Sequence, residues 1–298
     1  MEIQWYPGHM AKTKRLITES LKRVDAVCEI VDARIPEASR NPDVDQLAGG
    51  KPRLMLLNRA DQADPEQNAL WARYYRSKGF ATLETDAKTG AGVAAFPAAL
   101  RALLAEKIRR YEEKGMTGRT LKVMIVGIPN VGKSSFINKV LGRRSAKAED
   151  RPGVTRVNQW FFVDSGIELL DTPGILPPKM KNRRAGLLLA YTGAVKDTIL
   201  DLETLACGLM SELARVAPSA LTSRYGVEIP SYEDFEGPPE GDKEVAYGYE
   251  LLLAAAGKRG FLIAGGERDT ERMARVLLDE FREGKLGRIT LETPPAVE

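Results

Sequence analysis

The chain has 298 residues, of which 43% are hydrophobic and 29% charged. This composition can bury a core, so wholesale disorder is excluded. At roughly 150 residues per domain, the length predicts about two domains. The net charge of +3 gives no argument for nucleic acid by itself. Two cysteines, Cys28 and Cys207, are too few for a disulfide framework and have no metal-ligand spacing, which favours a reducing compartment.

No apolar run reaches the length of a membrane span, and the first residues (MEIQWYPGH) lack the pattern of a signal sequence. We therefore expect a cytoplasmic protein without a membrane segment. His9 is the single histidine of the chain. Any imidazole chemistry must use this residue, and a multi-histidine zinc site is excluded.

Strands and helices alternate over the first 180 residues. An aromatic Pro-Gly segment and a basic helical stretch come first, and a short joint precedes the fourth strand. The apolar patterns predict strands over 26–32, 53–57, 81–85, 123–126 and 167–170, and helices over 65–78 and 92–113. This alternation predicts an α/β fold with a mostly parallel sheet and helices on both faces.

The pattern changes after residue 180, where no strand–helix alternation remains. Helical periodicity covers 185–220, 244–256 and 268–283, and residues 228–243 are rich in Pro, Gly, Glu and Asp, as loops are. We therefore predict an α/β domain over 1–180, which includes a basic N-terminal arm at 1–25. A separate helical domain is expected over 181–298.

A phosphate-binding loop stands out at residues 127–134. Their sequence, GIPNVGKS, fits G-x-x-x-x-G-K-[ST] between a β-branched strand and a helix expected to begin near Lys133. The glycines let backbone N–H groups surround phosphate oxygens, and the helix N-terminus adds positive potential. Lys133 is expected to neutralise phosphate charge and Ser134 to ligate Mg²⁺. The predicted phosphate contacts are Asn130, Val131, Gly132, Lys133, Ser134 and Ser135.

Two further motifs indicate which nucleotide is bound. Residues 171–174 (DTPG) follow a strand as D-x-x-G does in GTPases, where Asp171 would hold Mg²⁺ through water and the Gly174 N–H would face the γ-phosphate. Residues 58–61 (NRAD) follow a buried strand and resemble N-K-x-D. The Asp61 carboxylate would accept two hydrogen bonds from the guanine edge, which adenine does not offer.

The remaining guanine contacts are expected from Asn58, from Arg59 and from a base-covering loop at 86–88 that contains Asp86 and Ala87. Arg59 replaces the usual Lys of this motif. Its stem and planar head can still cover the base face, although Arg and Lys are not interchangeable.

The order of these motifs is unusual. The guanine motif and the base-covering loop precede the phosphate loop, Thr155 and Asp171, whereas ordinary GTPases have the phosphate loop first. The same sheet can form from a chain that is cut and rejoined elsewhere, because ladder bonds depend on strand adjacency. Together with residues 5–10 (WYPGHM), 32–36 (DARIP) and 284–290 (GKLGRIT), this order resembles the circularly permuted ribosome biogenesis GTPase A (YlqF-type) family over nearly the whole chain.

The resemblance implies a circularly permuted P-loop GTPase domain followed by a smaller all-helical C-terminal domain. It also implies a role in late assembly of the large ribosomal subunit, GTP hydrolysis stimulated by that particle, and contact of the helical domain with ribosomal RNA. We expect the protein to be a monomer that binds GTP or GDP. Departures from the family pattern are Arg59, Asp86 where a small residue is common, and extra basic residues in 176–181.

The expected hydrolytic machinery is unusual as well. Thr155 has the position of the switch threonine that completes the Mg²⁺ shell, although a threonine at the start of a strand is the plainer interpretation. The position after D-x-x-G is Ile175, which cannot orient water. His9 is therefore the candidate catalytic group, while packing or RNA binding is the alternative role for it.

Asn130 is a candidate ligand for potassium. The resemblance implies a K⁺ ion that supplies transition-state charge, and an amide oxygen is a suitable ligand for such a cation. The alternative is an asparagine that only stabilises the loop turn.

Two competing functions remain open from the sequence. An ATP-dependent kinase or ATPase is favoured by the phosphate loop alone, and Ile175 favours a nucleotide-sensing RNA-binding module with negligible hydrolysis.

Seven basic residues are expected to contact RNA phosphates, and solvated surface charge is the alternative interpretation of them. These residues are Lys12, Lys14, Arg15, Lys258, Arg259, Lys285 and Arg288.

Overall fold

The chain forms two compact units. The structure, a computed structural model, describes residues 15, 17–142, 159–164, 166–172, 174, 183–195, 197 and 201–296. The first unit comprises Met1–Lys181 with Glu292–Glu298, and the second comprises Asn182–Leu291. Among the described residues, no helix is long and apolar enough to cross a bilayer.

The first unit is built around a six-stranded sheet with the order β3-β2-β1-β4-β6-β5. Neighbouring strands are parallel except for β5 and β6, which pair antiparallel at one edge. The strands are β1 (Ala26–Asp32), β2 (Arg53–Asn58), β3 (Ala81–Thr85), β4 (Leu121–Val126), β5 (Gln159–Asp164) and β6 (Ile167–Asp171). Every residue of β1 and β2 is buried, as expected for parallel strands covered on both faces. The predicted mostly parallel sheet is confirmed.

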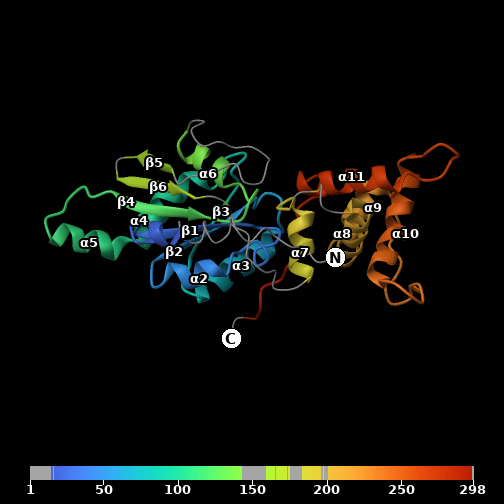
Figure 1. The fold of residues 1–298 in the computed structure, drawn as a ribbon, viewed down its shortest axis with the longest axis horizontal. Helices are drawn as coiled ribbons and strands as arrows, with labels where there is room; N and C mark the ends of the chain where they lie inside the picture. The colour runs from blue at the N-terminus through green and yellow to red at the C-terminus, as the bar shows by residue number, and fades with distance from the viewer. Residues whose placement is uncertain are drawn as a thin grey trace. The chain divides into compact units, whose positions relative to one another are not determined.

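Helices cover both faces of this sheet, with α2 and α3 on one side and α6 on the other (Figure 1). On the first face, the helical residues 17–21 pack with Val27 and Met124, and Trp71 of α3 packs with Val31. On the second face, Phe96 and Phe136 meet edge to face with their ring centroids 5.0 Å apart. Besides the helical residues 17–21, the described helices of this unit are α2 (Asp43–Ala48), α3 (Pro65–Ser77), the 3₁₀ turn η1 (Val93–Ala95), α4 (Phe96–Leu103), α5 (Ala105–Glu113) and α6 (Lys133–Val140).

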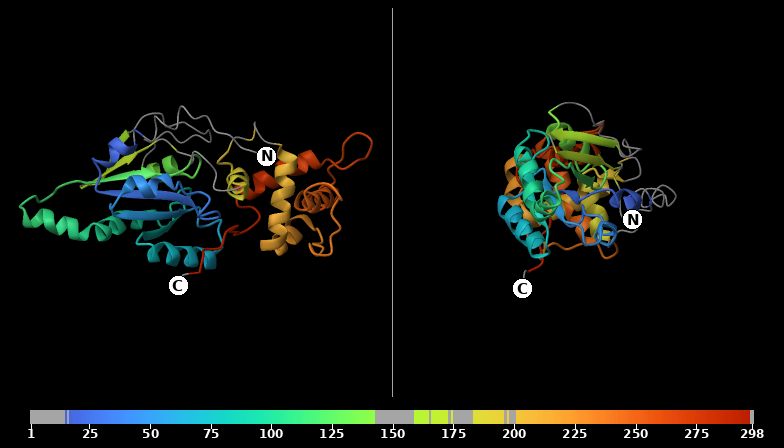
Figure 2. Two further views of the ribbon diagram at one scale, coloured as in Figure 1. Left: turned by 60° about the horizontal axis from the view of Figure 1, so that its bottom comes forward. Right: turned by 90° about the vertical axis from the view of Figure 1, so that its left-hand side faces the viewer.

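The helix predicted over 92–113 is interrupted. It consists of η1, α4 and α5, with the break at Leu104, whose φ is −102° and ψ 11°. Leu104 is the last buried residue of the stretch, and α5 has no buried residue at all. The apolar face that holds α4 against the sheet therefore ends where the helix breaks, and Figure 2 shows α5 projecting beyond the sheet.

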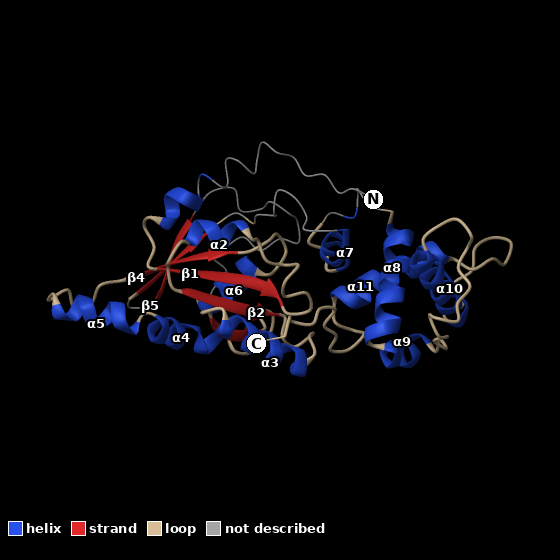
Figure 3. Cartoon of the chain, turned by 90° about the horizontal axis from the view of Figure 1, so that it is seen from below, coloured by secondary structure: helices blue, strands red, loops and turns tan. Residues whose placement is uncertain are grey.

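All regular secondary structure that is described in the second unit is helical (Figure 3). They are α7 (Arg183–Tyr191), α8 (Leu202–Val216), α9 (Pro218–Tyr225), α10 (Lys243–Lys258) and α11 (Thr270–Arg282). Helix α8 is the centre of this unit, because ten consecutive residues from Leu205 to Ala214 are buried. The predicted loop over 228–243 lies between α9 and α10, and Asp242 caps the start of α10 by accepting from the Glu244 N–H.

Residues 292–298 group with the first unit, whereas the sequence pattern predicts a helical domain over 181–298. The Glu292 carboxylate accepts hydrogen bonds from the backbone N–H groups of Glu37 (2.8 Å) and Ala38 (3.1 Å). The indole N–H of Trp71 donates to the Glu292 carbonyl at 3.1 Å. These contacts fix the chain to the first unit directly after Leu291.

Close packing of α8 on α10 leads to a stability prediction. Gly248 is buried in α10, and a Cβ atom added there would lie 1.8 Å from the carbonyl oxygen of Cys207 in α8. Gly248→Ala must therefore push the helices apart, and we expect a loss of about 1–3 kcal/mol in the free energy of unfolding, measured by denaturant titration. Gly257→Ala in the same helix is the control, because its added methyl meets only the movable side chain of Arg268. Equal stability of the two variants would contradict this account.

Candidate functional site

The predicted motifs gather at the carboxyl edge of the parallel strands. The loops after β1, β2, β4 and β6 carry residues 32–36, 58–61, 127–132 and 171–174. Because β2, β1, β4 and β6 are consecutive neighbours in the sheet, the ends of these strands lie side by side. Ligands of open α/β sheets bind in this position.

The phosphate loop has the backbone shape that its sequence predicts. Gly132 caps helix α6 with a left-handed φ of 98°, and Asn130 is left-handed as well, with a φ of 59°. Helix α6 begins at Lys133, as expected. Ser134 lies half-buried in its first turn and Ser135 is exposed. The positive end of the α6 dipole therefore lies at the loop.

Lys133 is a buried cation held by the loop itself. Its ammonium donates to the carbonyl oxygens of Gly127 (3.2 Å) and Ile128 (3.0 Å), and 7% of the residue is exposed. Burial lowers the pKa of Lys133 to about 8, although the negative charge of Asp171 acts in the opposite direction. A buried ammonium that faces neutral carbonyl oxygens is well suited to receive an anionic ligand.

The D-x-x-G segment lies against the phosphate loop. Asp171 is 3% exposed at the end of β6, and the Thr172 hydroxyl donates to the Ile125 carbonyl of β4 at 2.7 Å. A Cβ atom at Gly174 would lie 2.9 Å from both the Lys133 Nζ and the Pro129 nitrogen. Only glycine fits this approach without a shift, so the structure brings Asp171, Gly174 and Lys133 together.

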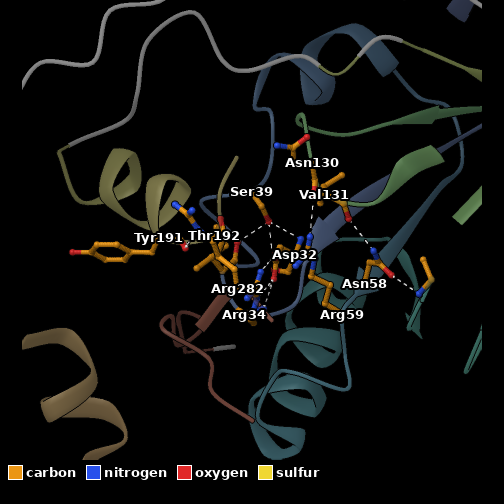
Figure 4. A network of polar contacts seen from close by, with 12 residues as sticks. Asp32, Arg34, Ser39, Asn58, Arg59, Asn130, Val131, Tyr191, Thr192 and Arg282 are labelled. Atoms are coloured by element: carbon orange, nitrogen blue, oxygen red, sulfur yellow. Dashed lines mark hydrogen bonds and ion pairs between the residues drawn. The ribbon is translucent and has the colours of Figure 1, made fainter. Parts of the chain in front are cut away.

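Asn58 connects three loops through its side-chain amide. Its Nδ2 donates to the Val131 carbonyl in the phosphate loop at 2.8 Å (Figure 4). Its Oδ1 accepts from the backbone N–H of Ala87 (3.0 Å) and from the Thr85 hydroxyl (3.3 Å). The amide therefore ties the guanine motif to both the phosphate loop and the predicted base-covering loop.

Arg59 lies between an acid and the phosphate loop. Its Nη2 donates to the Asn130 carbonyl at 3.2 Å, and its Nε lies 3.6 Å from Oδ2 of Asp32. Arg59 has a φ of 61°, a left-handed conformation that costs a non-glycine residue roughly 1–2 kcal/mol. In the described part of the chain, Arg59 and Asn130 are the two non-glycine residues with positive φ, and they are hydrogen-bonded to each other.

Asp32 is a buried carboxylate shared by two guanidinium groups. Besides its ion pair with Arg59, it accepts hydrogen bonds from Arg34 through Nε at 2.9 Å and Nη2 at 2.7 Å, and the Arg34 side chain is 1% exposed. Burial alone would raise the pKa of Asp32, but the charges of Arg34 and Arg59 outweigh it and leave the pKa below its ordinary value of 3.8. The carboxylate is therefore ionised at neutral pH.

Asp86 shapes its own loop. Its carboxylate accepts from the backbone N–H groups of Lys88 (2.7 Å) and Thr89 (3.0 Å) and from the Thr89 hydroxyl. Burial raises the pKa of Asp86, but the lowering effect of these hydrogen bonds is larger in sum. The pKa of Asp86 is therefore below its ordinary value. Asp61 is exposed at the turn after β2, and no hydrogen bond or ion pair joins it to another described residue.

Two residues predicted to act in hydrolysis, His9 and Thr155, lie outside the described residues, and so does the apolar Ile175. The structure brings together Asn58, Arg59, Ala87, Val131, Gly132, Lys133, Asp171 and Gly174. The functional roles of all these residues remain predictions.

Comparisons with known proteins assign the family. A family described as 50S ribosome-binding GTPase matches residues 122–215. The chain is 44% identical to ribosome biogenesis GTPase A of Bacillus cereus, over 99% of this chain and 95% of that protein. The corresponding protein of Priestia megaterium is also 44% identical, over 100% and 99% of the two chains. The chain belongs to the ribosome biogenesis GTPase A family.

Solved structures agree with this assignment. The crystal structure of GNP-bound YlqF from T. maritima has a TM-score of 0.62 and 27% identity, and covers 96% of this chain and 100% of that one. A GDP-bound YlqF structure has the same TM-score at 28% identity. The predicted fold class, a circularly permuted GTPase domain with a helical C-terminal region, is confirmed. The protein is a GTP hydrolase that binds GTP and GDP.

Sequence reasoning assigned no role to Asp32, Arg34 or Thr85, although the structure places all three in the site. Asp32 directly follows a buried strand, which is a signal that it lies at the carboxyl edge of the sheet. Its partner Arg59 is 27 residues away, and no local pattern connects the two.

The buried charge of Lys133 predicts a conflict between stability and function. Lys133→Met removes a charge whose burial is unfavourable in the nucleotide-free protein, and loses two hydrogen bonds to carbonyl groups. We expect the free energy of unfolding at pH 7 to rise by about 1–2 kcal/mol, while nucleotide binding is lost.

The pH dependence supplies the check on this prediction. Because the folded pKa of about 8 lies below the ordinary 10.5, the unfolded chain binds more protons between these values, so the wild type gains stability as the pH rises through them. The advantage of Lys133→Met should shrink over this range in denaturant titrations. Lys139→Met, at an exposed lysine of the same helix, is the control and should show no such trend. A variant less stable than the wild type at pH 7 would contradict the proposed burial cost.

Proposed function

We propose that this GTPase binds precursors of the large ribosomal subunit and acts in their late assembly as a switch that GTP hydrolysis resets. The observation that carries the proposal is full-length similarity to proteins named ribosome biogenesis GTPase A, together with the nucleotide-site motifs at the edge of one sheet. In this proposal the protein acts as a cytoplasmic monomer. It hydrolyses GTP slowly alone and faster on the particle.

The proposed nucleotide contacts come from the loops at the carboxyl edge of the sheet. Asp61 reads the guanine edge, Arg59 covers the base face, and Asn58 holds the Asp86–Ala87 loop and the phosphate loop at the right separation. Lys133 contacts the phosphates with the backbone of Val131, Gly132 and the first turn of α6, including Ser135, and the Gly174 N–H faces the γ-phosphate. Phosphate oxygens would replace the neutral carbonyl partners of Lys133, and their negative charge would offset the unfavourable burial of the ammonium.

Two cations complete the proposed site. The residues that would hold Mg²⁺ are Ser134, Thr155 and Asp171, and the buried carboxylate of Asp171 at the end of β6 fits a hard cation. The ion supplies neutralisation of phosphate charge when bound. Asn130 would offer its amide oxygen to K⁺. Its backbone in the phosphate loop is left-handed, as is that of Arg59.

His9 is proposed to orient or deprotonate the attacking water, since the apolar Ile175 cannot do so. For the RNA contacts, Lys258 and Arg288 are exposed, as a phosphate-binding role requires. Arg15 is paired with Glu19, and Arg259 lies 3.6 Å from Glu280 and over the Tyr225 ring. Lys285 is paired with Glu283. Lys258 therefore has the better support, while Lys12 and Lys14 lie outside the described residues.

Co-sedimentation with purified large subunits tests the function. We expect binding with a non-hydrolysable GTP analogue and release with GDP, because hydrolysis resets the switch. Binding should weaken as salt increases, since each phosphate contact releases counterions. Equal binding in both nucleotides would remove the switch, and binding insensitive to salt would point to a protein interface.

Guanine selectivity tests the assignment of Asp61. Asp61→Asn replaces a double acceptor with an amide, so we expect a loss of about 100-fold in preference for GTP over xanthine nucleotide. Competition binding measures this ratio. Asp64→Asn, at the N-cap of α3, is a nearby control whose carboxylate accepts from Glu66 and Gln67 backbone N–H groups. Unchanged selectivity in Asp61→Asn would show that another residue reads the base.

The role of His9 is tested by stimulated turnover. His9→Ala should leave GTP affinity and basal hydrolysis nearly intact and reduce particle-stimulated hydrolysis by about 100-fold, a usual size for a lost general base. Binding of the variant to subunits with the GTP analogue is the control and should stay normal. Loss of that binding alongside the stimulation would make His9 a docking residue.

A further inference from the structure

Asp32, Arg34, Arg59 and Asn130 form a continuous set of polar contacts from a fully buried position to the phosphate loop. Figure 4 shows Arg59 beside Asp32, with Asn130 above them in the phosphate loop. Arg34 holds the Asp32 carboxylate through two hydrogen bonds, and the Arg34 N–H adds a third at 3.0 Å. Arg34 therefore holds the Asp32 carboxylate in place independently of Arg59.

The guanidinium group of Arg59 has the geometry for two partners at once. Its Nε faces Asp32 while its Nη2 donates to the Asn130 carbonyl. The five N–H donors of a guanidinium point along different edges of a plane, whereas a lysine ammonium presents all its donors from one atom. A lysine at position 59 could contact either the Asp32 carboxylate or the phosphate loop, but not both at once.

We propose that Asp32 is a positioning residue that acts through Arg59: it fixes the guanidinium so that Arg59 holds the Asn130 carbonyl and thereby sets the phosphate loop for guanine-nucleotide binding. This inference rests on the proposed guanine site and explains why arginine stands where the family pattern has lysine. The left-handed backbone at both Arg59 and Asn130 supports it. Each residue is held in an unfavourable conformation that the hydrogen bond between them helps to maintain.

The test must not leave Arg34 buried without its acid, because an unpaired buried charge strongly destabilises a fold. The first variant is therefore Asp32→Asn/Arg34→Met, in which the Asn Oδ1 still accepts the backbone N–H of residue 34. The second is Arg59→Lys, and the third combines all three substitutions. Equilibrium binding of GDP and of a non-hydrolysable GTP analogue is measured for each full-length variant.

We expect the Asp32→Asn/Arg34→Met variant and the Arg59→Lys variant each to bind both nucleotides about tenfold more weakly. The combined variant should bind no more weakly than either, because Asp32 acts only through Arg59. A combined loss near 100-fold, or normal affinity in Asp32→Asn/Arg34→Met, would overturn the proposal.

Ser39→Ala is the matched control. The Ser39 hydroxyl accepts from the Asp32 backbone N–H at 2.9 Å and does not touch Arg59, so this variant should lower Tm while leaving nucleotide affinity unchanged. A loss of nucleotide affinity in Ser39→Ala would show that Asp32 affects binding only through general packing. Asp61→Asn and Lys133→Ala in the same assay distinguish a failure of the positioning role from a failure of the proposed site. If both bind guanine nucleotides normally, the proposed site itself is wrong, whereas their failure beside a normal Arg59→Lys defeats only the positioning role.

Discussion

The parallel ladder between β1 and β4 is the contact on which the nucleotide site depends. It joins the half of the first unit that carries the guanine motif to the half that carries the phosphate loop, in a register from Ala26 with Val123 to Glu29 with Val126. A Cβ atom at Gly127 would lie 2.7 Å from the Ile30 carbonyl oxygen, so the phosphate loop leaves the sheet in direct contact with β1. The permuted chain order is compatible with GTPase geometry because this adjacency, rather than the covalent order, places the loops.

The guanine-motif loop and the phosphate loop also depend on this strand pairing. A Cβ atom at Gly132 would lie 2.4 Å from Nδ2 of Asn58, and this amide donates to the carbonyl of Val131, 73 residues away in the chain. Such contacts join residues far apart in the chain, so the guanine and phosphate halves of the site depend on the same long-range strand pairing. A nucleotide that contacts both halves stabilises the folded unit by mass action, and the buried charge of Lys133 favours an anion at the phosphate loop.

The motifs and most strands were predictable because their signals are local. Parallel strands buried on both faces appear as short apolar runs, and the phosphate loop has fixed spacing between Gly127 and Lys133. The pairing of Asp32 with Arg59 was not predictable, because it joins the ends of two strands and depends on a left-handed backbone at an arginine. The helix break at Leu104 and the return of Glu292 to the first unit were missed for a related reason: tertiary packing decides both, and helical periodicity carries no information on it.

The two left-handed residues show how the site uses strain. Glycine would adopt the backbone of position 59 or 130 without penalty, as it does at Gly132, yet the chain has a large side chain at one and an amide at the other. Glycine at position 59 would remove the guanidinium group that spans Asp32 and the phosphate loop, and glycine at 130 would remove the amide side chain from that loop. We therefore expect the unfavourable conformations to be retained for the sake of the two side chains, and the buried pair of Asp32 with Arg34 is the support that we propose for Arg59.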